Sequence, residues 1–385
     1  MNLSYLAGAM ALALSAAAPA FAGMTLEERL EQMEARMRHL ESRVAAQDEV
    51  IRDKDRQIAE LKETGGSGGT GGGWWQGVEM SGLVEVEASH TSPFEGDDES
   101  DLVVATVELG VEAQVNDWMS ANLLLLWEED EGDVTVDEAF VTFGNADVSP
   151  FSFTAGRIVA PFGVFETHMV SDPFTLDLGE TKETAALVGY ESNGINAAAY
   201  AFNGDLDHSD NHIDNFGLSV GYGNDDFNVG LDYISDIGDS DVLADVVDEA
   251  AYSDRVGGVA VHAQYSAGPI SVIGEYVTAV DDFEVGALEF DGEGARPAAF
   301  NIEAGYTMEQ GVAGRETTVA VGYQQTKEAL AIELPEKRVS VAASVAVNDN
   351  ATIAVEWAHD TDYDQSEGGT GENADTVTAQ LAVEF

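Results

Sequence analysis

The chain ends in TVTAQLAVEF, Thr376 to Phe385, and these ten residues decide its fold class. Alternate residues of a β-strand face opposite sides of a sheet. One face of this segment is apolar and ends in Phe385, whereas the other carries Thr378, Gln380 and Glu384. The alternation is typical of a strand that separates lipid from a watery lumen.

The connectors between strand-like runs alternate between short and long from Gly77 onward. Seven short connectors contain tight-turn residues, at Asn116-Asp117, Asn145 to Ser149, Asn193-Gly194, Asn224 to Asp226, Ala267 to Pro269, Glu309 to Gly314 and Asn348 to Asn350. Eight long polar connectors lie near residues 91–100, 128–133, 160–183, 204–213, 236–254, 281–296, 326–334 and 361–373. Fifteen connectors separate sixteen strands, and this arrangement is typical of an outer-membrane barrel. We therefore predict an all-β fold: a 16-stranded antiparallel transmembrane β-barrel over residues 74–385, preceded by an N-terminal α-helical coiled coil.

Aromatic residues lie beside the predicted short turns: Trp118, Phe143, Phe151, Tyr190, Tyr222, Phe227, Tyr265, Tyr306 and Phe385. Outer-membrane barrels carry such a belt where lipid meets water, and a C-terminal aromatic residue resembles the C-terminal signal of these barrels. We expect Phe385 to end the last strand at this belt and that strand to pair with the first, which removes both sheet edges. A soluble β-sandwich would also alternate, but it needs no belt.

The N-terminal part has three predicted segments. Residues 1–22 are expected to be a secretory signal peptide, because an apolar stretch precedes the small-x-small pattern Ala20-Phe21-Ala22; a membrane anchor is the alternative. Residues 24–63 are expected to be a periplasmic coiled coil. Residues 64–73, within TGGSGGTGGG, are expected to be a flexible linker.

The coiled coil is predicted from eleven positions at alternating spacings of four and three, of which nine are apolar and the other two are Gln47 and Lys54. The apolar seam consists of Leu26, Leu30, Met33, Met37, Leu40, Val44, Ile51, Ile58 and Leu61. Arg29, Arg36 and Arg43 fall where each can reach an acid on a neighbouring helix, and the surrounding units resemble a trimerisation motif of short coiled coils. We therefore predict a homotrimer; a helix packed on its own protein is the alternative.

The acidic composition excludes several functions. The formal net charge is -56 and there is no cysteine, so thiolate chemistry and disulfides are absent. Of 16 Lys and Arg, eight lie before Thr64, as do 11 of the 72 Asp and Glu, which leaves 61 acids and eight bases for the rest. Such a surface does not bind nucleic-acid phosphates. It is explained either by adaptation to high salt or by a field that attracts cations.

The third long connector, Pro161 to Thr184, is too apolar for a freely solvated loop. We expect it to fold into the barrel as a constriction; an external cap is the alternative. Glu85 and Glu87 alternate with apolar residues and should face the lumen. The candidate constriction residues are Arg157, Pro161, Phe162, Gly163, Phe165, Glu166, Thr167, Asp172, Pro173, Glu180, Thr181 and Glu183.

Two details of these candidate sites stay open. Arg157 can give the constriction an anion-binding group, but it shares strand parity with Phe153 and Ala155 and can instead point to lipid headgroups. The acidic loop DLDHSDNHID, Asp205 to Asp214, offers His208 and His212 for a divalent cation. The spacing fits no EF-hand, so we favour a solvated acidic loop, and we predict neither a resident metal nor a cofactor.

Several motifs in and around the third long connector are similar to those of the LbtU family siderophore porins. They are Gly156-Arg157, Pro161-Phe162-Gly163, Phe165-Glu166-Thr167, Ser171-Asp172-Pro173, Gly179-Glu180-Thr181, Gly189-Tyr190 and Asn203-Gly204. The order of coiled coil and barrel is also shared. The resemblance implies an outer-membrane channel for ferric siderophores that works without a plug domain. Many ferric siderophores are anionic, whereas this lumen is expected to be strongly negative.

The expected function, following this resemblance, is a channel for ferric siderophore uptake without a plug domain. We expect it in the bacterial outer membrane, in contact with lipid and lipopolysaccharide. A general or cation-preferring porin for small hydrophilic solutes is one alternative, and it needs only a charged constriction. A structural tether that acts through the coiled coil is another. We do not expect an enzyme: a hydrolase would need Ser, His and an acid brought together in space, and no local nucleophile motif supports one.

Overall fold

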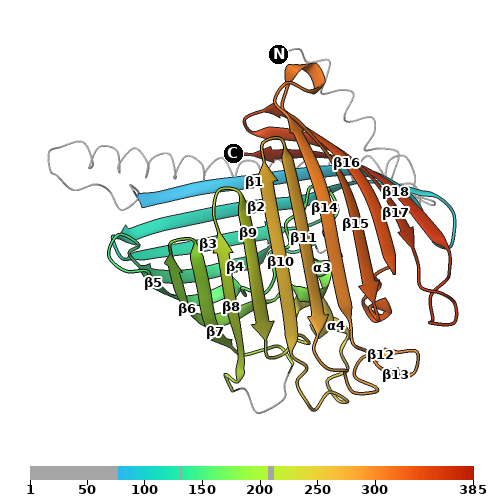
Figure 1. Ribbon diagram of the computed structural model, residues 1–385, viewed down its shortest axis with the longest axis horizontal. Helices are drawn as coiled ribbons and strands as arrows, with labels where there is room; N and C mark the ends of the chain where they lie inside the picture. Colours follow the sequence, from blue (N-terminus) through green and yellow to red (C-terminus); the bar gives the residue numbers. More distant parts are fainter. Residues whose placement is uncertain (1–76, 130–131, 207–211) are drawn as a thin grey trace, which may run out of the picture. The chain divides into compact units, whose positions relative to one another are not determined.

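The computed structural model describes residues 77–129, 132–206 and 212–385 (Figure 1). Sixteen of its strands form one closed antiparallel barrel in which each strand pairs with its sequence neighbours and β1 pairs with β18. The prediction of a 16-stranded antiparallel barrel is thus confirmed. The predicted signal peptide, coiled coil and linker lie outside the described residues.

The barrel strands are 8 to 18 residues long. The first eight are β1 (Val78–Ser92), β2 (Glu99–Asn116), β3 (Met119–Trp127), β4 (Thr135–Gly144), β5 (Phe151–Val159), β6 (Lys182–Ser192), β7 (Ile195–Phe202) and β8 (Asn215–Gly223). The others are β9 (Phe227–Ile234), β10 (Gly258–Ala267), β11 (Ile270–Ala279), β14 (Ala298–Met308), β15 (Thr317–Lys327), β16 (Lys337–Asn348), β17 (Ala351–Thr361) and β18 (Asn373–Glu384).

The C-terminal residue closes the barrel. Phe385 N donates a hydrogen bond to Gly82 O at 3.0 Å, and Gly82 N donates to Phe385 O at 2.8 Å. The Phe385 ring lies over Gly82, where an added Cβ would come within 2.5 Å of the ring. The alternation noted in TVTAQLAVEF therefore ends in a direct bond between the last residue and the first strand.

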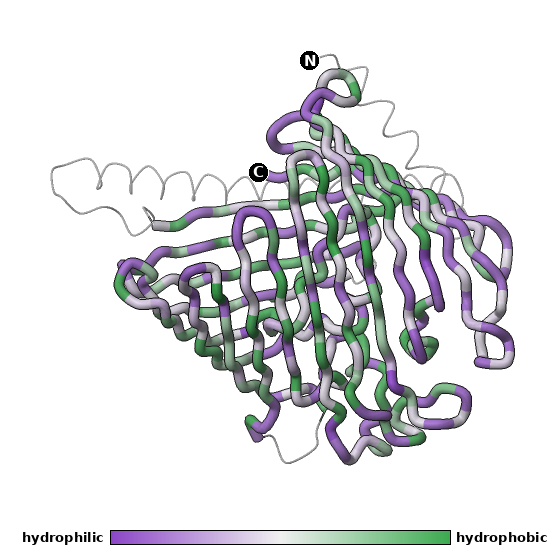
Figure 2. Tube along the Cα trace, viewed as in Figure 1, coloured by the Kyte–Doolittle hydropathy of each residue, from purple (hydrophilic) through white to green (hydrophobic). Residues whose placement is uncertain are grey.

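Side chains alternate across the barrel wall, as the hydropathy pattern along the strands shows (Figure 2). On β16, Val339 and Val341 are exposed on the outside, whereas Ser340 and Ala342 are buried on the inside. Eight of the nine predicted belt aromatics are exposed, and the ninth, Tyr190, packs edge-on against Phe151 at 5.1 Å between ring centroids. An apolar exterior with a belt of rings at the short turns suits a lipid environment.

The long connectors carry the remaining elements. They are α3 (Phe174–Gly179), α4 (Asp241–Val246), the small hairpin β12 (Glu289–Phe290) and β13 (Glu293–Gly294), and the 3-10 turn η3 (Leu330–Ile332). Another 3-10 turn, η2 (Val312–Gly314), lies in the short connector between β14 and β15. Near the lower ends of β10, β11 and β14, α4 and the hairpin lie together (Figure 1). None of the helices in the described ranges has the length and apolar character needed to cross a membrane.

Candidate functional site

The connector between β5 and β6, residues 160–181, lies inside the barrel, and we call it the strap. It begins and ends at adjacent strands, yet its backbone is bonded to β9, β11, β14, β15 and β17 on the far part of the ring. Phe162, Phe174 and Leu178 are buried in the main apolar cluster. The structure therefore places this connector in the lumen and not on the outside as a cap.

Carboxylates on the inner face of the barrel bind the first half of the strap. Glu275 of β11 accepts hydrogen bonds from Val164 N at 2.8 Å and Phe165 N at 3.2 Å. Glu303 of β14 accepts one from His168 N at 2.6 Å. A third carboxylate, Glu356 of β17, accepts from the backbone N–H groups of the next turn of the strap, residues 170 and 171, at 2.6 and 2.8 Å.

Small residues let the strap approach the wall closely. Met169 forms a buried cluster with Ala320 and Ala342, and its Cε lies 3.0 Å from where a Cβ of Gly322 would be. His168 Nε2 lies 2.8 Å from Ser271 Oγ, within hydrogen-bonding distance. The strap thus lies flat on β14 to β16 between its bonds to the carboxylates.

The strap turns at Gly163, whose φ is +85°. An added Cβ there would come within 2.4 Å of the Phe165 ring and 3.2 Å of Glu275 Oε1. Gly163 N also donates to Asp232 Oδ2 of β9 at 3.1 Å. Only glycine combines this left-handed conformation with such a close approach at no steric cost.

The helix α3 ends the strap and is fixed on the opposite wall. Phe174 N donates to Gln324 Oε1 of β15 at 2.7 Å, and Thr175 Oγ1 donates to Glu275 Oε2 at 2.8 Å. Beyond α3, Lys182 N donates to Asp241 Oδ1 in the connector between β9 and β10 at 2.9 Å. Apolar residues of the long connectors pack on the same cluster as α3, among them Ile237, Leu243, Phe283 and Leu288.

The strap fills one side of the lumen and leaves a passage on the other. Inward-facing polar residues from β9 to β17 are buried: Asp232, His262, Glu275, Asn301, Glu303, Gln324, Ser340 and Glu356. Inward-facing polar residues of β1 to β4 and β18 keep part of their surface in water: Glu85, Glu87, Glu108, Asn122, Glu138 and Gln380. The open passage therefore runs between the strap and β1 to β4.

Carboxylates border this passage on both sides. Asp172 of the strap is exposed to the water of the lumen. Its pKa is nevertheless raised above the ordinary value, first by enclosure in the barrel and then by the nearby charge of Glu87, whereas the charge of Lys182 lowers it. Burial also raises the pKa of Asp177 to about 6, with Asp172 adding to the shift and Arg338 opposing it. The passage thus has a high density of negative charge.

The basic side chains that act on Asp172 and Asp177 in the described part of the chain, Lys182 and Arg338, are both neutralised by ion pairs. Lys182 Nζ lies 3.0 Å from both Asp137 Oδ1 and Glu180 Oε2. Arg338 binds Asp360 through both carboxylate oxygens, at 2.7 and 3.0 Å. Within the described residues, Glu85, Glu87 and Asp172 form no ion pair, so their charges act on the water of the passage.

Most of the predicted constriction residues lie in the strap, but their environments differ. Phe162, Pro173 and Thr181 are buried, whereas Glu166 and Asp172 are exposed to the lumen. The remaining members lie on the strap or at its end: Pro161, Gly163, Phe165, Thr167 and Glu180. The predicted lumen residues Glu85 and Glu87 do face inward, and Glu87 accepts a hydrogen bond from Gln380 at 2.9 Å.

Two predicted residues lie elsewhere. Arg157 pairs laterally with Ala139 and Thr184 and shares the outward row with exposed Phe153, while adjacent Ile158 is buried inside. This placement favours the lipid-headgroup alternative over an anion-binding group in the constriction. Glu183 faces inward but is only 6% exposed, so it does not border the open passage.

Sequence reasoning missed the wall carboxylates Glu275, Glu303 and Glu356, and also Asp177. Each of the three wall carboxylates lies at an inward position of its strand with no charged residue directly before or after it, and this pattern was the available signal. The possible metal loop includes residues 207–211, which lie outside the described residues. Among the described ones, no group of three or more His, Asp or Glu is arranged to hold a metal ion.

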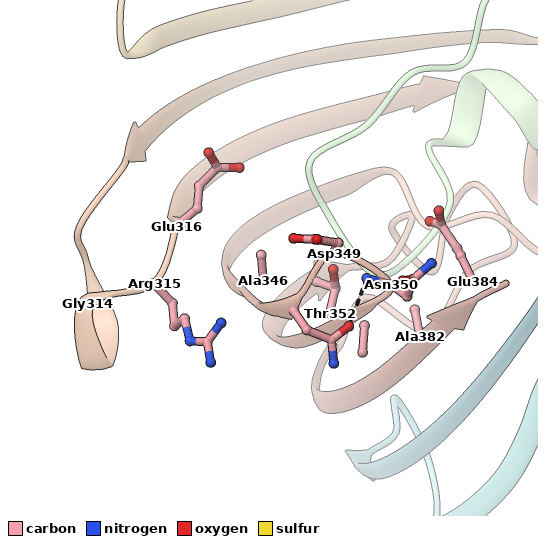
Figure 3. Close-up of a pocket in the computed structure, with 11 residues that line it drawn as sticks. Gly314, Arg315, Glu316, Ala346, Asp349, Asn350, Thr352, Ala382 and Glu384 are labelled. Atoms are coloured by element: carbon pink, nitrogen blue, oxygen red, sulfur yellow. Dashed lines mark hydrogen bonds between the residues drawn. The ribbon is translucent and has the colours of Figure 1, made fainter.

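A second feature is a hollow of about 450 Å³ at the short-turn end of the barrel (Figure 3). It lies between η2 and the turn that joins β16 to β17, and Arg315, Glu316 and Glu384 line it. Asn350 N donates to Asn348 Oδ1 at 2.8 Å and fixes that turn. The lining is polar and open to water, as expected at the mouth of a water-filled barrel.

A closed 16-stranded barrel with an apolar exterior, an aromatic belt and an inward-folded third long connector defines a porin-type β-barrel. The chain belongs to the UPF0422 family. It is 30% identical over 312 residues to a UPF0422 protein of Coxiella burnetii, covering 77% of this chain and 67% of that protein. It is 29% identical over 355 residues to a UPF0422 protein of Legionella pneumophila, covering 80% and 66%. The chain thus spans about two thirds of the length of these relatives.

Solved porins share the fold. The barrel superposes on Salmonella typhi OmpF with a TM-score of 0.58 at 16% identity, over 80% of this chain and 97% of that one. The outer-membrane channel DcaP of Acinetobacter baumannii superposes with a TM-score of 0.57 at 13% identity, over 80% of this chain and 97% of that one. An anion-selective porin from Comamonas acidovorans superposes with a TM-score of 0.58 at 12% identity, over 80% of this chain and 99% of that one. At such low sequence identities the comparison shows a shared fold and no more. No model of a protein family matches the sequence.

Proposed function

We propose that this protein is an outer-membrane channel that passes small hydrophilic solutes and prefers cations. One observation carries the proposal. Lys182 and Arg338 are neutralised by ion pairs, whereas Glu85, Glu87 and Asp172 face the open passage and have no ion-pair partner among the described residues. Low-dielectric walls focus the field of such charges. Rings of Asp and Glu favour cations in pores.

The test is the reversal potential of the purified protein in a planar bilayer under a KCl gradient. The wild type should show cation preference, and Glu85→Gln with Glu87→Gln should reduce it. Glu95→Gln with Asp97→Asn is the matched control, since it removes the same charge from an exposed connector between β1 and β2. A wild-type channel without cation preference would overturn the proposal.

Ferric siderophore uptake is the second candidate, and the motif resemblance around residues 156–184 supports it. A siderophore channel should show saturable uptake of the ferric complex. Replacing residues 164–180 by a Gly-Ser linker should abolish saturation while small ions still pass. Linear uptake by the intact protein would instead favour the general porin.

Trimerisation through residues 24–63 and a tethering role of this segment remain proposals, supported by the apolar seam in the sequence. A peptide of residues 24–64 should be helical and trimeric in sedimentation equilibrium. Leu40→Asp should dissociate it, because it buries a charge in the seam. A peptide that stays monomeric at high micromolar concentration would contradict this assembly.

A further inference from the structure

The backbone N–H groups of the strap have no neighbouring strand to bond to, unlike those of the barrel strands. Irregular backbone at the depth of the membrane must have its N–H groups satisfied by protein or by lumen water. For residues 163–171, the wall supplies most of these partners from side chains, and all of them are carboxylates. The strap is therefore bound to the barrel as a row of backbone donors facing a row of acidic acceptors.

Each of the three principal carboxylates uses both of its oxygens. Glu275 accepts Val164 N on Oε1 and Phe165 N on Oε2. Glu303 accepts Thr167 Oγ1 on Oε1 and His168 N on Oε2. Glutamine offers only one acceptor oxygen, and its amide group would present hydrogens to these donors. The geometry thus requires a carboxylate and not merely a polar side chain.

Glu356 completes the row on β17. Its Oε1 accepts Ser171 Oγ at 2.8 Å, while its Oε2 accepts Val170 N and Ser171 N. It is only 2% exposed, and Glu303 and Glu275 are 1% and 4% exposed. No lysine or arginine pairs with any of the three among the described residues. They are stabilised by the donors of the strap and, for Glu303, also by Asn301 Nδ2 of the wall, which donates to Oε1 at 3.0 Å.

We propose that Glu275, Glu303 and Glu356 are positioning residues that hold the strap against β11 to β17 and so set the width of the passage. The inference rests on the proposed channel function but not on its cation preference. The strap's own charges, at Asp172 and Asp177, then contribute to selectivity, while the wall carboxylates fix where those charges stand.

The test uses the natural lack of cysteine. Glu166→Cys provides one thiol on the exposed face of the strap for a nitroxide label. In the full-length protein, Glu303→Gln should raise label mobility and lose the immobilised spectral component, and single-channel records should show a wider or fluctuating conductance. Combining it with Glu275→Gln and Glu356→Gln should enlarge both effects.

The matched control is Glu95→Gln, which makes the same chemical change in the exposed connector between β1 and β2. Heat-modifiable migration and the far-UV dichroism of each variant establish that the barrel is folded. Unchanged label mobility and conductance in the folded triple variant would overturn the inference. If the triple variant does not fold, Glu303→Asp, which keeps the charge but shortens the side chain, should still raise mobility, and an unchanged spectrum there would also overturn it. Label mobility does not depend on ion selectivity, so failure of this inference is distinguishable from failure of the proposed function.

Discussion

The guanidinium carbon of Arg338 lies 4.6 Å from the centre of the Phe174 ring, which joins β16 to the first residue of α3. The same guanidinium binds both oxygens of Asp360. Arginine suits this position because its planar group can stack on a ring and also form a bidentate pair. One side chain thus fixes the end of the strap and neutralises a wall carboxylate.

Arg338→Lys should therefore destabilise the folded barrel although it keeps the charge. Loss of the bidentate pair and the ring contact should lower the free energy of unfolding by about 1–3 kcal/mol. Urea unfolding in detergent micelles measures this. Lys337→Arg is the control, because the Lys337 side chain is 41% exposed and pairs with Glu336, and solvent-exposed ion pairs contribute little to stability. Equal stability of the two variants would count against the proposed role of Arg338.

Cation preference should weaken as the pH falls through 6. The pKa of Asp177 is raised from 3.8 to about 6, chiefly by burial, so this carboxyl loses its charge between pH 7 and pH 5. The charge of Asp172 adds to this shift, and the pKa of Asp172 is itself raised. Reversal potentials measured from pH 7 to pH 5 should show this loss of cation preference. In the Asp177→Asn variant, cation preference should depend less on pH. A pH profile identical in the two proteins would contradict the assignment.

The same pKa shift predicts a stability trend of definite sign. A carboxyl whose pKa is higher in the folded state binds its proton more tightly there, so its ionisation opposes folding. The contribution of Asp177 to the free energy of unfolding should therefore fall as the pH rises from about 4 to about 6, and it should stay level above that range. Unfolding free energies of wild type and Asp177→Asn across this range would reveal it as a difference in slope.

Gly163→Ala should distort the strap. Its φ of +85° and the nearby Phe165 ring leave no room for a Cβ. A non-glycine residue held there should cost about 1–3 kcal/mol, lowering stability or altering conductance as the strap moves. Gly274→Ala is the control, because the nearest atom to a Cβ there is Asn301 O at 3.9 Å. Unfolding and single-channel conductance of both variants should be compared.

Deleting Phe385 should slow barrel closure. The deletion removes both backbone hydrogen bonds to Gly82 and the ring that covers it. The amount of heat-modifiable barrel in the outer membrane should fall, while secretion to the periplasm continues. Phe385→Tyr keeps the ring and the backbone and should assemble as the wild type does. Normal assembly of the deletion variant would show that β1 and β18 close the barrel without Phe385.

The strand count could be predicted because it depends on local signals. Period-two alternation and turn residues mark each strand and connector without any knowledge of distant contacts. The inward position of the strap also followed from a local property, its apolar composition between Pro161 and Thr184. The barrel prediction therefore needed only neighbouring residues.

The contacts of the strap could not be predicted, because they join residues far apart in the sequence. Phe165 binds Glu275 across 110 positions, and Ser171 binds Glu356 across 185. The side of the wall to which Arg157 points depended on strand register, and the burial of Glu183 depended on packing. No local pattern specifies either: the sequence left Arg157 open and placed Glu183 in the constriction, whereas Glu183 is only 6% exposed.

The strap is bound to one half of the barrel, whereas the carboxylates that face the water of the passage belong largely to the other half. Aperture and the charge of the barrel wall are therefore determined by different strands, whereas the charges of Asp172 and Asp177 move with the strap. Substitutions on β1 and β2 can alter which ions are favoured without disturbing the bonds to Glu275, Glu303 and Glu356. Changes on β11, β14 and β17 can alter the size limit while the charge pattern opposite stays in place. Such a division would let a lineage, or an engineer, change the charge of the passage wall on β1 and β2 without changing permeant size.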